Sequence, residues 1–484
     1  MFKKYKFLIV SISIYLIVVG TVSVLRHYQF QTQAWDMGIF EQTMWNTANG
    51  RVMQNSLEEV SNHLGVHMSP FLFLLIPFYI FWQSPYFLII IQTMAIAFGA
   101  IPLYFFAKEK LPNSGLTKAI IVSYLLHPSL LGVNLFDFHA VSFFIPLVLS
   151  AFYFFEKKRY FWTSFFMVLA ASTKEDAAVV SIFIVFYWLL ISLFKFENKK
   201  IIRRKINKQS KKVLSLLIFL ILYFIISVKL VMPALGGGLV RIDRYAHFGS
   251  TIGEVLKNVF LNPALLFSTV FTYAKIKYVF FLLLPVIFLS LRSFSFIFLV
   301  LPGVAENILT NYNPQFSGLY QYDAVILPGL YISTIYGLVF LLNKIKKERA
   351  VACVMIALSL ISFGYFLFYN PLFASVLNTT DLFVGNKNRA VYDKVVKMIP
   401  KEGSVAAPTV MVPHLTHREY IRMIGTEDFF TDIVIIDRFD KYGFNSDEQF
   451  QAYFDSKINS QFYNMTVVDD QLVVLTKKNI MLKH

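Results

Sequence analysis

Charged residues are scarce in this sequence. They make up 15% of its 484 residues, against 56% for hydrophobic residues. Because a soluble domain usually carries roughly 25% charged residues, this chain has too few to cover a surface in water. Cysteine is scarcer still: Cys353 is the single example, which excludes an intrachain disulfide. Walker A, GxSxG and Rossmann motifs and zinc-type cysteine clusters are also missing, so the sequence gives no support to the protein classes that they mark.

Long apolar runs dominate the sequence instead, and 52 residues are Phe. A membrane-spanning helix needs roughly 20 apolar residues. The first run follows MFKKYK; it is too long for the core of a signal peptide, and no small-residue cleavage site follows it. We predict a polytopic α-helical membrane protein with about eleven transmembrane helices, at residues 7–25, 86–107, 118–136, 140–155, 160–173, 177–194, 213–232, 273–290, 293–309, 324–342 and 350–369.

Basic residues occur in short runs between the apolar segments. The net charge is +16, and the loop 195–212 alone holds about nine basic residues and one acid. By the positive-inside rule, this loop and the N-terminus are predicted to be cytoplasmic. The basic loops all fall on that side only if the run 68–82, which contains Pro70 and Pro77, is a juxtamembrane or re-entrant helix. The positive charge therefore indicates orientation in a cell membrane, and no nucleic-acid partner is predicted.

The composition changes after about residue 370. The segments SVAAPTVMV, DIVIIDR and MTVVDDQLVVLTKK have the pattern of short buried strands, separated by polar and helical stretches. We predict a transmembrane domain over residues 1–369, with a first outer loop at 26–85, and a small α/β domain over 370–484. The number of crossings places this second domain on the extracytoplasmic side.

The first outer loop carries two acids, Asp36 and Glu41, among aromatic and apolar residues. Trp35, Phe40 and Met44 suit a helix that lies on the membrane surface, with Asp36 at its start. One interpretation is that Asp36 caps this helix, since a carboxylate accepts hydrogen bonds from N–H groups of the first turn. The other is that Asp36 is a general base whose proton affinity is raised by apolar surroundings. Glu41 is a candidate substrate-binding residue.

The same loop contains His63 and His67. Their spacing puts both imidazoles on one helix face, as a metal site needs, and Glu58 or Glu59 could add oxygen ligands. The glutamate of an HExxH motif is missing, so a hydrogen bond from His67 to substrate and a purely structural role are the alternatives. No cofactor is predicted, and a divalent metal is an open alternative.

Two further outer segments carry candidate substrate-binding residues. Asp137 and His139 share a face in an extended segment and point apart in a helix. Lys174, Glu175 and Asp176 follow one another between two apolar runs, either as a self-compensating turn or as part of a polar cavity.

The loop LGGGLVRIDRYAHFG has flexible glycines followed by Arg241 and Arg244. A guanidinium donates two parallel hydrogen bonds and so suits a phosphate or pyrophosphate headgroup; the alternative is ordinary anchoring to the lipid surface. Tyr322, in a later outer loop, completes the candidate set. Ionisable groups at membrane depth are costly unless they line a polar cavity, so their collection on one face predicts a functional site there. The alternative is that outer loops need polar residues in any case.

Several segments, in order as well as in content, resemble a known family. They are WDMGIFEQTMWNTANGR, HMSPFLFLLIPFY, FGAIPLYFFAKEKL, HPSLLGVNLFDFHAVSFFIPLVLSAFYFFEKKRY, STKED, and SVAAPTVMVPHLTHR followed by DIVIID. The chain resembles the predicted bacterial and archaeal membrane proteins of domain-of-unknown-function family 2079. That family is grouped with the GT-C superfamily of membrane glycosyltransferases, which includes protein mannosyltransferases and the aminoarabinose transferase of lipid A. This chain departs from the family at Gln321-Tyr322-Asp323, where the family has a His–Tyr pair before the tenth helix.

The resemblance implies a GT-C-like fold and inverting sugar transfer from a polyprenyl-phosphate donor at the extracytoplasmic face. By position, Asp36 is the base or the acid that orients the acceptor, and Arg241 or Arg244 holds the lipid phosphate. The partners implied are this donor, the lipid bilayer and an acceptor that is a glycan, a lipid or a protein. The alternative function is a transporter or flippase of a lipid-linked or small anionic substrate, which predicts ionisable groups near mid-membrane instead of on one face.

Overall fold

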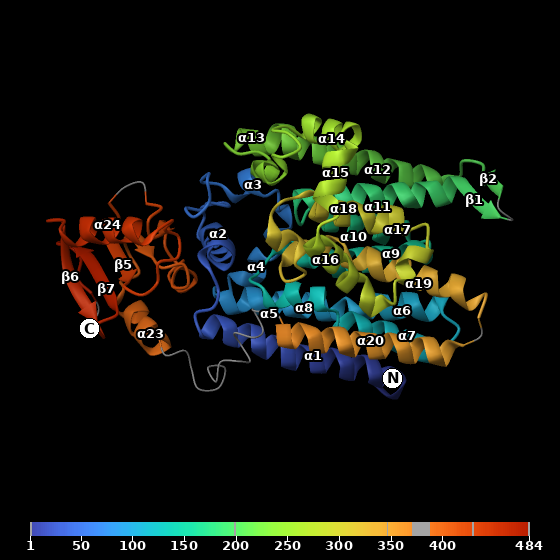
Figure 1. Ribbon diagram of the computed structural model, residues 1–484, viewed down its shortest axis with the longest axis horizontal. Helices are drawn as coiled ribbons and strands as arrows, with labels where there is room; N and C mark the ends of the chain where they lie inside the picture. The colour runs from blue at the N-terminus through green and yellow to red at the C-terminus, as the bar shows by residue number, and fades with distance from the viewer. Residues whose placement is uncertain (1, 198–199, 346, 370–387, 428–429, 483–484) are drawn as a thin grey trace.

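The computed structural model describes residues 2–197, 200–345, 347–369, 388–427 and 430–482. Figure 1 shows two parts: a bundle of helices that run roughly along the long axis of the molecule, and a smaller domain with a β-sheet at one end of the bundle. The first helix begins well away from this smaller domain.

Each of the predicted apolar runs coincides with helical structure, which confirms the predicted helical membrane fold. Among the described residues, five helices are long and apolar enough to cross a membrane, and the number is seven if each of two bent pairs is one span. Three shorter apolar helices are Ala140–Glu156, Tyr160–Ala171 and Leu327–Leu342. One pair bends by 41° at Pro128, which has no N–H to continue the preceding helix. The runs correspond to α1 (Phe2–Tyr28), α5 (Pro85–Phe98) with α6 (Ala100–Lys110), α7 (Ser114–Leu125) with α8 (Pro128–Leu135), α9 (Phe144–Glu156), α10 (Tyr160–Ala171), α11 (Glu175–Leu193), α12 (Lys208–Ile226), α16 (Tyr273–Leu283), α17 (Phe296–Leu299) with α18 (Leu301–Leu309), α19 (Leu327–Leu342) and α20 (Glu348–Tyr369).

The ambiguous run 68–82 forms two short helices, η2 (Pro70–Leu74) and α4 (Ile76–Tyr79), each with a proline in its first turn. Neither is long enough to span a membrane, in agreement with the prediction that this run does not cross. Helix α4 packs against α2 (Ile39–Ala48), and the Tyr79 side chain is fully buried there. This segment therefore supports the first loop.

The basic loops lie together at the end of the bundle away from the smaller domain (Figure 1). Part of the loop 195–212 belongs to an antiparallel pair, β1 (Phe194–Glu197) and β2 (Lys200–Arg203), which the sequence pattern did not indicate. The junctions between α6 and α7 and between α19 and α20 lie at the same end. The positive-inside rule requires that the basic loops lie on one side of the membrane, and this arrangement agrees with it. The cytoplasmic location of that end stays a prediction.

The smaller domain contains a five-stranded sheet in the order β4-β3-β5-β7-β6. The predicted strands in DIVIIDR and MTVVDDQLVVLTKK are β5 and the hairpin β6–β7, whose turn holds Asp469 and Asp470 at positive φ. The segment SVAAPTVMV forms only the short strand β3, because Pro408 follows it and cannot donate to a strand ladder. Strand β4 was not predicted. The elements are α23 (Arg389–Met398), β3 (Val405–Ala407), β4 (Ile421–Met423), β5 (Ile433–Asp437), α24 (Asp447–Ile458), β6 (Tyr463–Val468) and β7 (Leu472–Lys477).

The first loop and the smaller domain share one apolar core. Phe30 and Ala34 of the loop are buried in the same cluster as Val405 and Met411 of the domain. The Ala34 N–H also donates to Thr409 Oγ1 at 3.2 Å. Burial of apolar side chains from both parts in one cluster stabilises their contact, so the domain is fixed on this loop.

His414 gives this contact a predicted pH dependence. Its ring is stacked on that of His27, with centroids 4.1 Å apart. Burial lowers the pKa of His414 from 6.5 to about 3, with Asp393 raising it and Arg389 lowering it further. Because the unfolded chain takes up this proton at higher pH than the folded chain, we expect the melting temperature of the purified protein to fall as pH falls from 6.5 towards about 3. A His414→Gln variant should show a flatter dependence, and an unchanged slope would contradict this role.

Candidate active site

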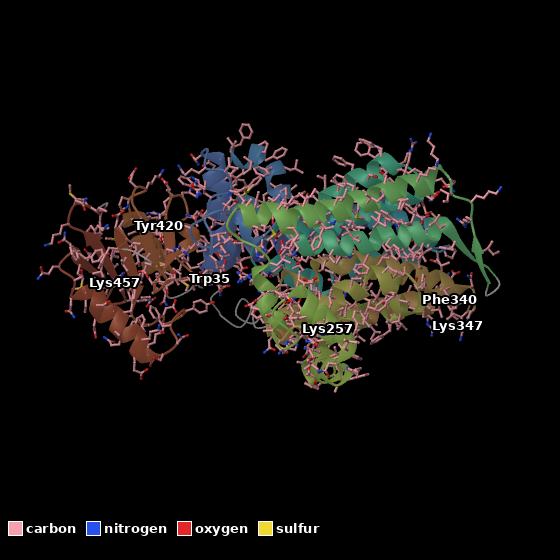
Figure 2. The ribbon with its side chains drawn as sticks, turned by 90° about the horizontal axis from the view of Figure 1, so that it is seen from above. Trp35, Lys257, Phe340, Lys347, Tyr420 and Lys457 are labelled. Atoms are coloured by element: carbon pink, nitrogen blue, oxygen red, sulfur yellow. The ribbon has the colours of Figure 1, made fainter. Side chains whose placement is uncertain are left out.

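A cavity of about 1330 Å³ lies where the bundle meets the smaller domain. Its wall combines the first loop, the segments before η3 (Ala140–Phe143) and α11, the turns η5 (Val240–Tyr245) and η9 (Gln321–Val325), and Tyr442 of the smaller domain. Figure 2 shows Trp35, one of the lining residues, between the bundle and this domain. Ten of the candidate site residues line the cavity: Asp36, His67, Asp137, His139, Lys174, Glu175, Asp176, Arg241, Arg244 and Tyr322.

Asp36 lies in a π-helical turn, Ala34–Gly38, that leads into α2, and it does not cap that helix. Another residue accepts the hydrogen bonds of the backbone N–H groups at the start of the helix. Asp137 Oδ2 accepts from Gln33 N–H at 2.8 Å and from Met37 N–H at 3.4 Å. The capping interpretation is therefore wrong for Asp36, because Asp137 occupies that role from a distant loop. The Asp36 carboxylate instead contacts His139, with Oδ1 and Nε2 3.0 Å apart.

His139 has a hydrogen-bond acceptor at each ring nitrogen. Its Nδ1 lies 2.9 Å from the backbone oxygen of Asp137, and its Nε2 faces Asp36. The extended alternative for this segment is the one observed, since His139 has φ −144° and ψ 132°. A neutral imidazole donates only once, so both contacts are satisfied only when the Asp36–His139 pair carries one extra proton.

Asp137 is almost fully buried beside this pair. Burial raises its pKa to about 6; Arg26 lowers the pKa and the Asp36 carboxylate raises it. Two backbone N–H groups at its Oδ2 hold it against the first loop. Asp137 therefore positions the turn that carries Asp36.

The adjacent charges at 174–176 take separate partners. Lys174 Nζ and Asp176 Oδ2 form an ion pair at 2.8 Å, as the self-compensating interpretation expects. Glu175 reaches the first loop instead, where its Oε1 lies 3.0 Å from His67 Nδ1. Burial alone would lower the pKa of Lys174, but Asp176 and Glu175 together raise it, so the ammonium stays charged in the cavity wall.

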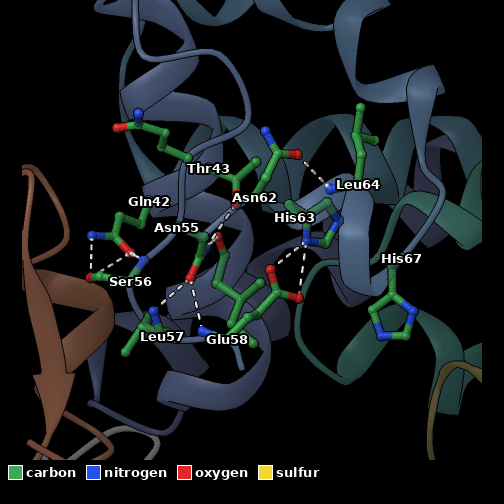
Figure 3. Close-up of polar contacts among 12 residues, drawn as sticks. Gln42, Thr43, Asn55, Ser56, Leu57, Glu58, Asn62, His63, Leu64 and His67 are labelled. Atoms are coloured by element: carbon green, nitrogen blue, oxygen red, sulfur yellow. Dashed lines mark hydrogen bonds and ion pairs between the residues drawn. The ribbon is translucent and has the colours of Figure 1, made fainter. Parts of the chain in front are cut away.

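The two histidines of the first loop bind different carboxylates. Figure 3 shows the contacts between His63 and Glu58. His63 Nδ1 lies 2.9 Å from Glu58 Oε2, whereas His67 is paired with Glu175. Their ring centroids are 6.0 Å apart. Within the part of the chain that the structure describes, no group of three or more His, Cys, Asp or Glu side chains is arranged to hold a metal ion.

Arg241 and Arg244, both on η5, differ in their partners. Arg241 pairs with Glu59 at 3.0 Å, and both side chains are about half exposed. Arg244 Nη1 donates to the Tyr322 hydroxyl at 3.2 Å, and its guanidinium lies over the Tyr312 ring, 4.1 Å from the centroid. Arg244 forms no ion pair with any described residue, so neutral groups orient its full positive charge in the cavity.

The glycines before Arg241 serve packing. A Cβ at Gly237 would lie 1.9 Å from the carbonyl oxygen of Gly65, and the Gly238 N–H donates to the same oxygen at 3.0 Å. Our interpretation of flexible glycines is corrected here: the stretch is pressed against α3 (His63–Val66), and this contact fixes where η5 begins.

Glu41 is the candidate that the cavity does not include. Its carboxylate is fully buried under α2, where Oε1 accepts from the Tyr79 hydroxyl at 2.5 Å and lies 2.8 Å from His417 Nε2. Burial raises the pKa of Glu41, and the bonds to His417 and Tyr79 lower it. This location removes the ground for a substrate-binding role and indicates a structural one, joining the first loop to the smaller domain.

Glu41→Ala is therefore expected to lower the free energy of unfolding by about 1–3 kcal/mol, because it leaves buried Tyr79 without its acceptor. Thermal melts would measure this, and Glu41→Gln, which keeps an acceptor oxygen, is the matched control and should lose less. Unchanged melting with weakened donor binding would restore the substrate-binding role.

The sequence interpretation missed part of the cavity. Glu306 lines it from within the predicted span 293–309, where an acid in an apolar helix is itself a signal of function. Apolar residues also line the wall, among them Val179 and Phe183 from α11, and Val255 and Val259 from α14 (Ile252–Leu261). The cavity is thus lined by both charged and apolar side chains.

The family model described as predicted membrane protein (DUF2079) matches residues 26–474. Among curated proteins, none matches the sequence. Among solved structures, the chain is similar to ArnT from Cupriavidus metallidurans bound to undecaprenyl phosphate, with a TM-score of 0.53 and 8% sequence identity over 97% of this chain and 98% of that one. At this identity the likeness shows the fold alone, and it confirms the predicted GT-C-type architecture.

Proposed function

This chain belongs to the DUF2079 family of predicted membrane proteins, and on that premise we propose that it is a membrane glycosyltransferase of the GT-C type. The reaction is transfer of a sugar from a polyprenyl-phosphate donor to an acceptor at the extracytoplasmic face, with inversion at the anomeric carbon. The acceptor is a glycan, a lipid or a protein.

The composition of the cavity is the observation that carries this proposal. One cavity holds a carboxylate, Asp36, a guanidinium, Arg244, that forms no ion pair with a described residue, and apolar side chains from α11 and α14. A polyprenyl phosphate has the matching parts, an apolar chain and an anionic headgroup. The ligand named for the ArnT structure, undecaprenyl phosphate, belongs to this chemical class.

The electrostatics of Tyr322 support a shared site for the base and the cations. Burial raises the pKa of Tyr322; Arg244 and Lys174 lower it and Asp36 raises it. The phenol therefore lies within electrostatic range of the proposed base, Asp36, and of the cations Arg244 and Lys174. Substrate bound beside Tyr322 would be within reach of the same groups.

In the proposed reaction, Asp36 takes the proton of an acceptor hydroxyl as its oxygen attacks the anomeric carbon. The bond between this carbon and the phosphate oxygen breaks, and the phosphate leaves with the electron pair. Arg244 stabilises the charge that develops on it, with Lys174 adding to the positive potential. Since the phosphate is already a good leaving group, positioning and charge stabilisation account for most of the expected rate enhancement.

The proposal is tested with purified protein in nanodiscs and a panel of labelled polyprenyl-phosphate pentoses and hexoses. We expect release of polyprenyl phosphate with the label moved to an acceptor from a membrane extract. Flipping of the lipid-linked sugar by reconstituted protein, with no sugar transferred, would overturn the proposal in favour of the transporter alternative.

His139 is expected to matter as the partner of Asp36. His139→Ala removes the contact that orients this carboxylate and should reduce kcat by about 10- to 100-fold with KM for the donor little changed. His139→Gln, whose amide can still donate a hydrogen bond, should retain more activity. A kcat unchanged by His139→Ala would contradict this role.

A further inference from the structure

A second hollow, of about 450 Å³, lies at the other end of the bundle, between the start of α1, the end of α6 and the start of α7. Among the described residues, its lining includes no acid and four lysines: Lys4, Lys6, Lys108 and Lys118. Tyr5 and Tyr104 form its aromatic wall. It shares no lining residue with the cavity at Asp36, so it is a separate site.

The lysines of this hollow differ from neighbouring lysines in their lack of an ion pair with any described residue. Nearby, Lys110 pairs with Glu156 at 2.7 Å, and Lys157 pairs with Glu109. Over the described residues, none of the four hollow lysines forms an ion pair. The Lys108 ammonium lies 5.9 Å from the ring centroids of both Tyr5 and Tyr104, and that of Lys4 lies 5.6 Å from Tyr5. Four like charges around one hollow repel one another, and a bound anion would remove that repulsion.

Helix α7 adds a second attraction for an anion. Its first-turn residues Ser114 and Thr117 line the hollow, which therefore lies beside the positive end of the helix dipole. The hollow also has an apolar border formed by Phe7, Leu8 and Val10. Beyond Val10, α1 carries a row of exposed apolar side chains, including Ile14 and Ile17.

We propose that this hollow binds the phosphate headgroup of an anionic phospholipid, with the acyl chains along the exposed face of α1. The lysines and the α7 N-terminus bind the phosphate. The apolar border contacts acyl chains, which a soluble phosphate lacks, and so favours a lipid. A basic loop needs no such hollow to satisfy the positive-inside rule. By the predicted orientation, the lipid belongs to the cytoplasmic leaflet.

Native mass spectrometry of the full chain in detergent, titrated with phosphatidylglycerol or phosphatidylethanolamine, tests this. Wild type should bind phosphatidylglycerol more tightly. The double variant Lys4→Gln/Lys108→Gln should bind it about 25-fold more weakly, since each lysine contributes about fivefold near a lipid surface. The control Lys110→Gln/Lys157→Gln removes the same charge at the same end and should change affinity by less than about threefold, because surface ion pairs contribute little.

Equal affinity for the two phospholipids, or equal weakening by both double variants, would overturn the proposal. Displacement of phosphatidylglycerol by millimolar inorganic phosphate alone would overturn the assignment to a lipid and leave a soluble anion. None of these measurements depends on sugar transfer, so the proposal stands or falls separately from the proposed enzyme activity.

Discussion

Replacing Asp36 by Asn is expected to reduce sugar transfer by about 10²–10⁴-fold, the range for loss of a single general base. Asn has the size of Asp and keeps an oxygen for the contact with His139, but it cannot take the proton of the acceptor hydroxyl. Single-turnover transfer from a labelled polyprenyl-phosphate donor measures the chemical step apart from product release.

The control is Asp447→Asn, an exposed carboxylate on α24 of the smaller domain, which should transfer sugar at the wild-type rate. Both variants should melt as the wild type does. Full transfer activity in a correctly folded Asp36→Asn protein would remove Asp36 from the mechanism and leave the cavity a binding site only.

Replacing Arg244 by Gln is expected to reduce kcat/KM by about 10²–10³-fold, the cost of losing one preorganised donor to developing charge. The reason is that Arg244 is held by neutral partners, Tyr322 and Tyr312, and forms no ion pair with a described residue, so its charge is available to the phosphate. Arg244→Lys should recover part of this loss, since a lysine keeps the charge but not the two parallel hydrogen bonds. Titration with undecaprenyl phosphate should give the highest affinity for wild type, a lower one for Arg244→Lys and the lowest for Arg244→Gln.

Arg241→Gln is the matched control, because Arg241 lies on the same turn but is half exposed and already paired with Glu59. Its expected effect is within about fivefold. A larger loss for Arg241→Gln than for Arg244→Gln would assign phosphate binding to Arg241 instead.

The helices of the membrane domain were predictable because a span requires a run of apolar residues, whatever it packs against. The run 68–82 was resolved by loop charge together with its prolines. The local sequence pattern did not predict elements that form only through contacts with distant segments. One is the short strand β4, which pairs with β3 in the sheet. The pattern failed also at α14, where a short amphipathic helix contributes Val255 and Val259 to the cavity wall.

The convergence of the charged loops was predictable because loops on one side of a membrane share one surface. Which residues of these loops pair was not predictable, because the partners are more than a hundred residues apart in the sequence. Asp137 supports the turn that Asp36 occupies, and Glu175 binds His67. The same limit led to the assignment of Glu41 to the site. Glu41, five residues after Asp36 on a short helix, points away from the cavity, and its contacts with buried Tyr79 and with His417 of the smaller domain show this.

The core shared by the first loop and the smaller domain sets an order of events during biosynthesis. Ala34 and its partner Thr409 are separated by 375 positions along the chain. At a translation rate of about 5–20 residues per second, roughly 20–75 s pass before the domain can cover the loop. Until then Phe30 and its neighbours have no partner, and the cavity lacks Tyr442. A nascent chain already inserted in the membrane therefore lacks a complete cavity, and the proposed activity requires that the smaller domain has emerged and docked.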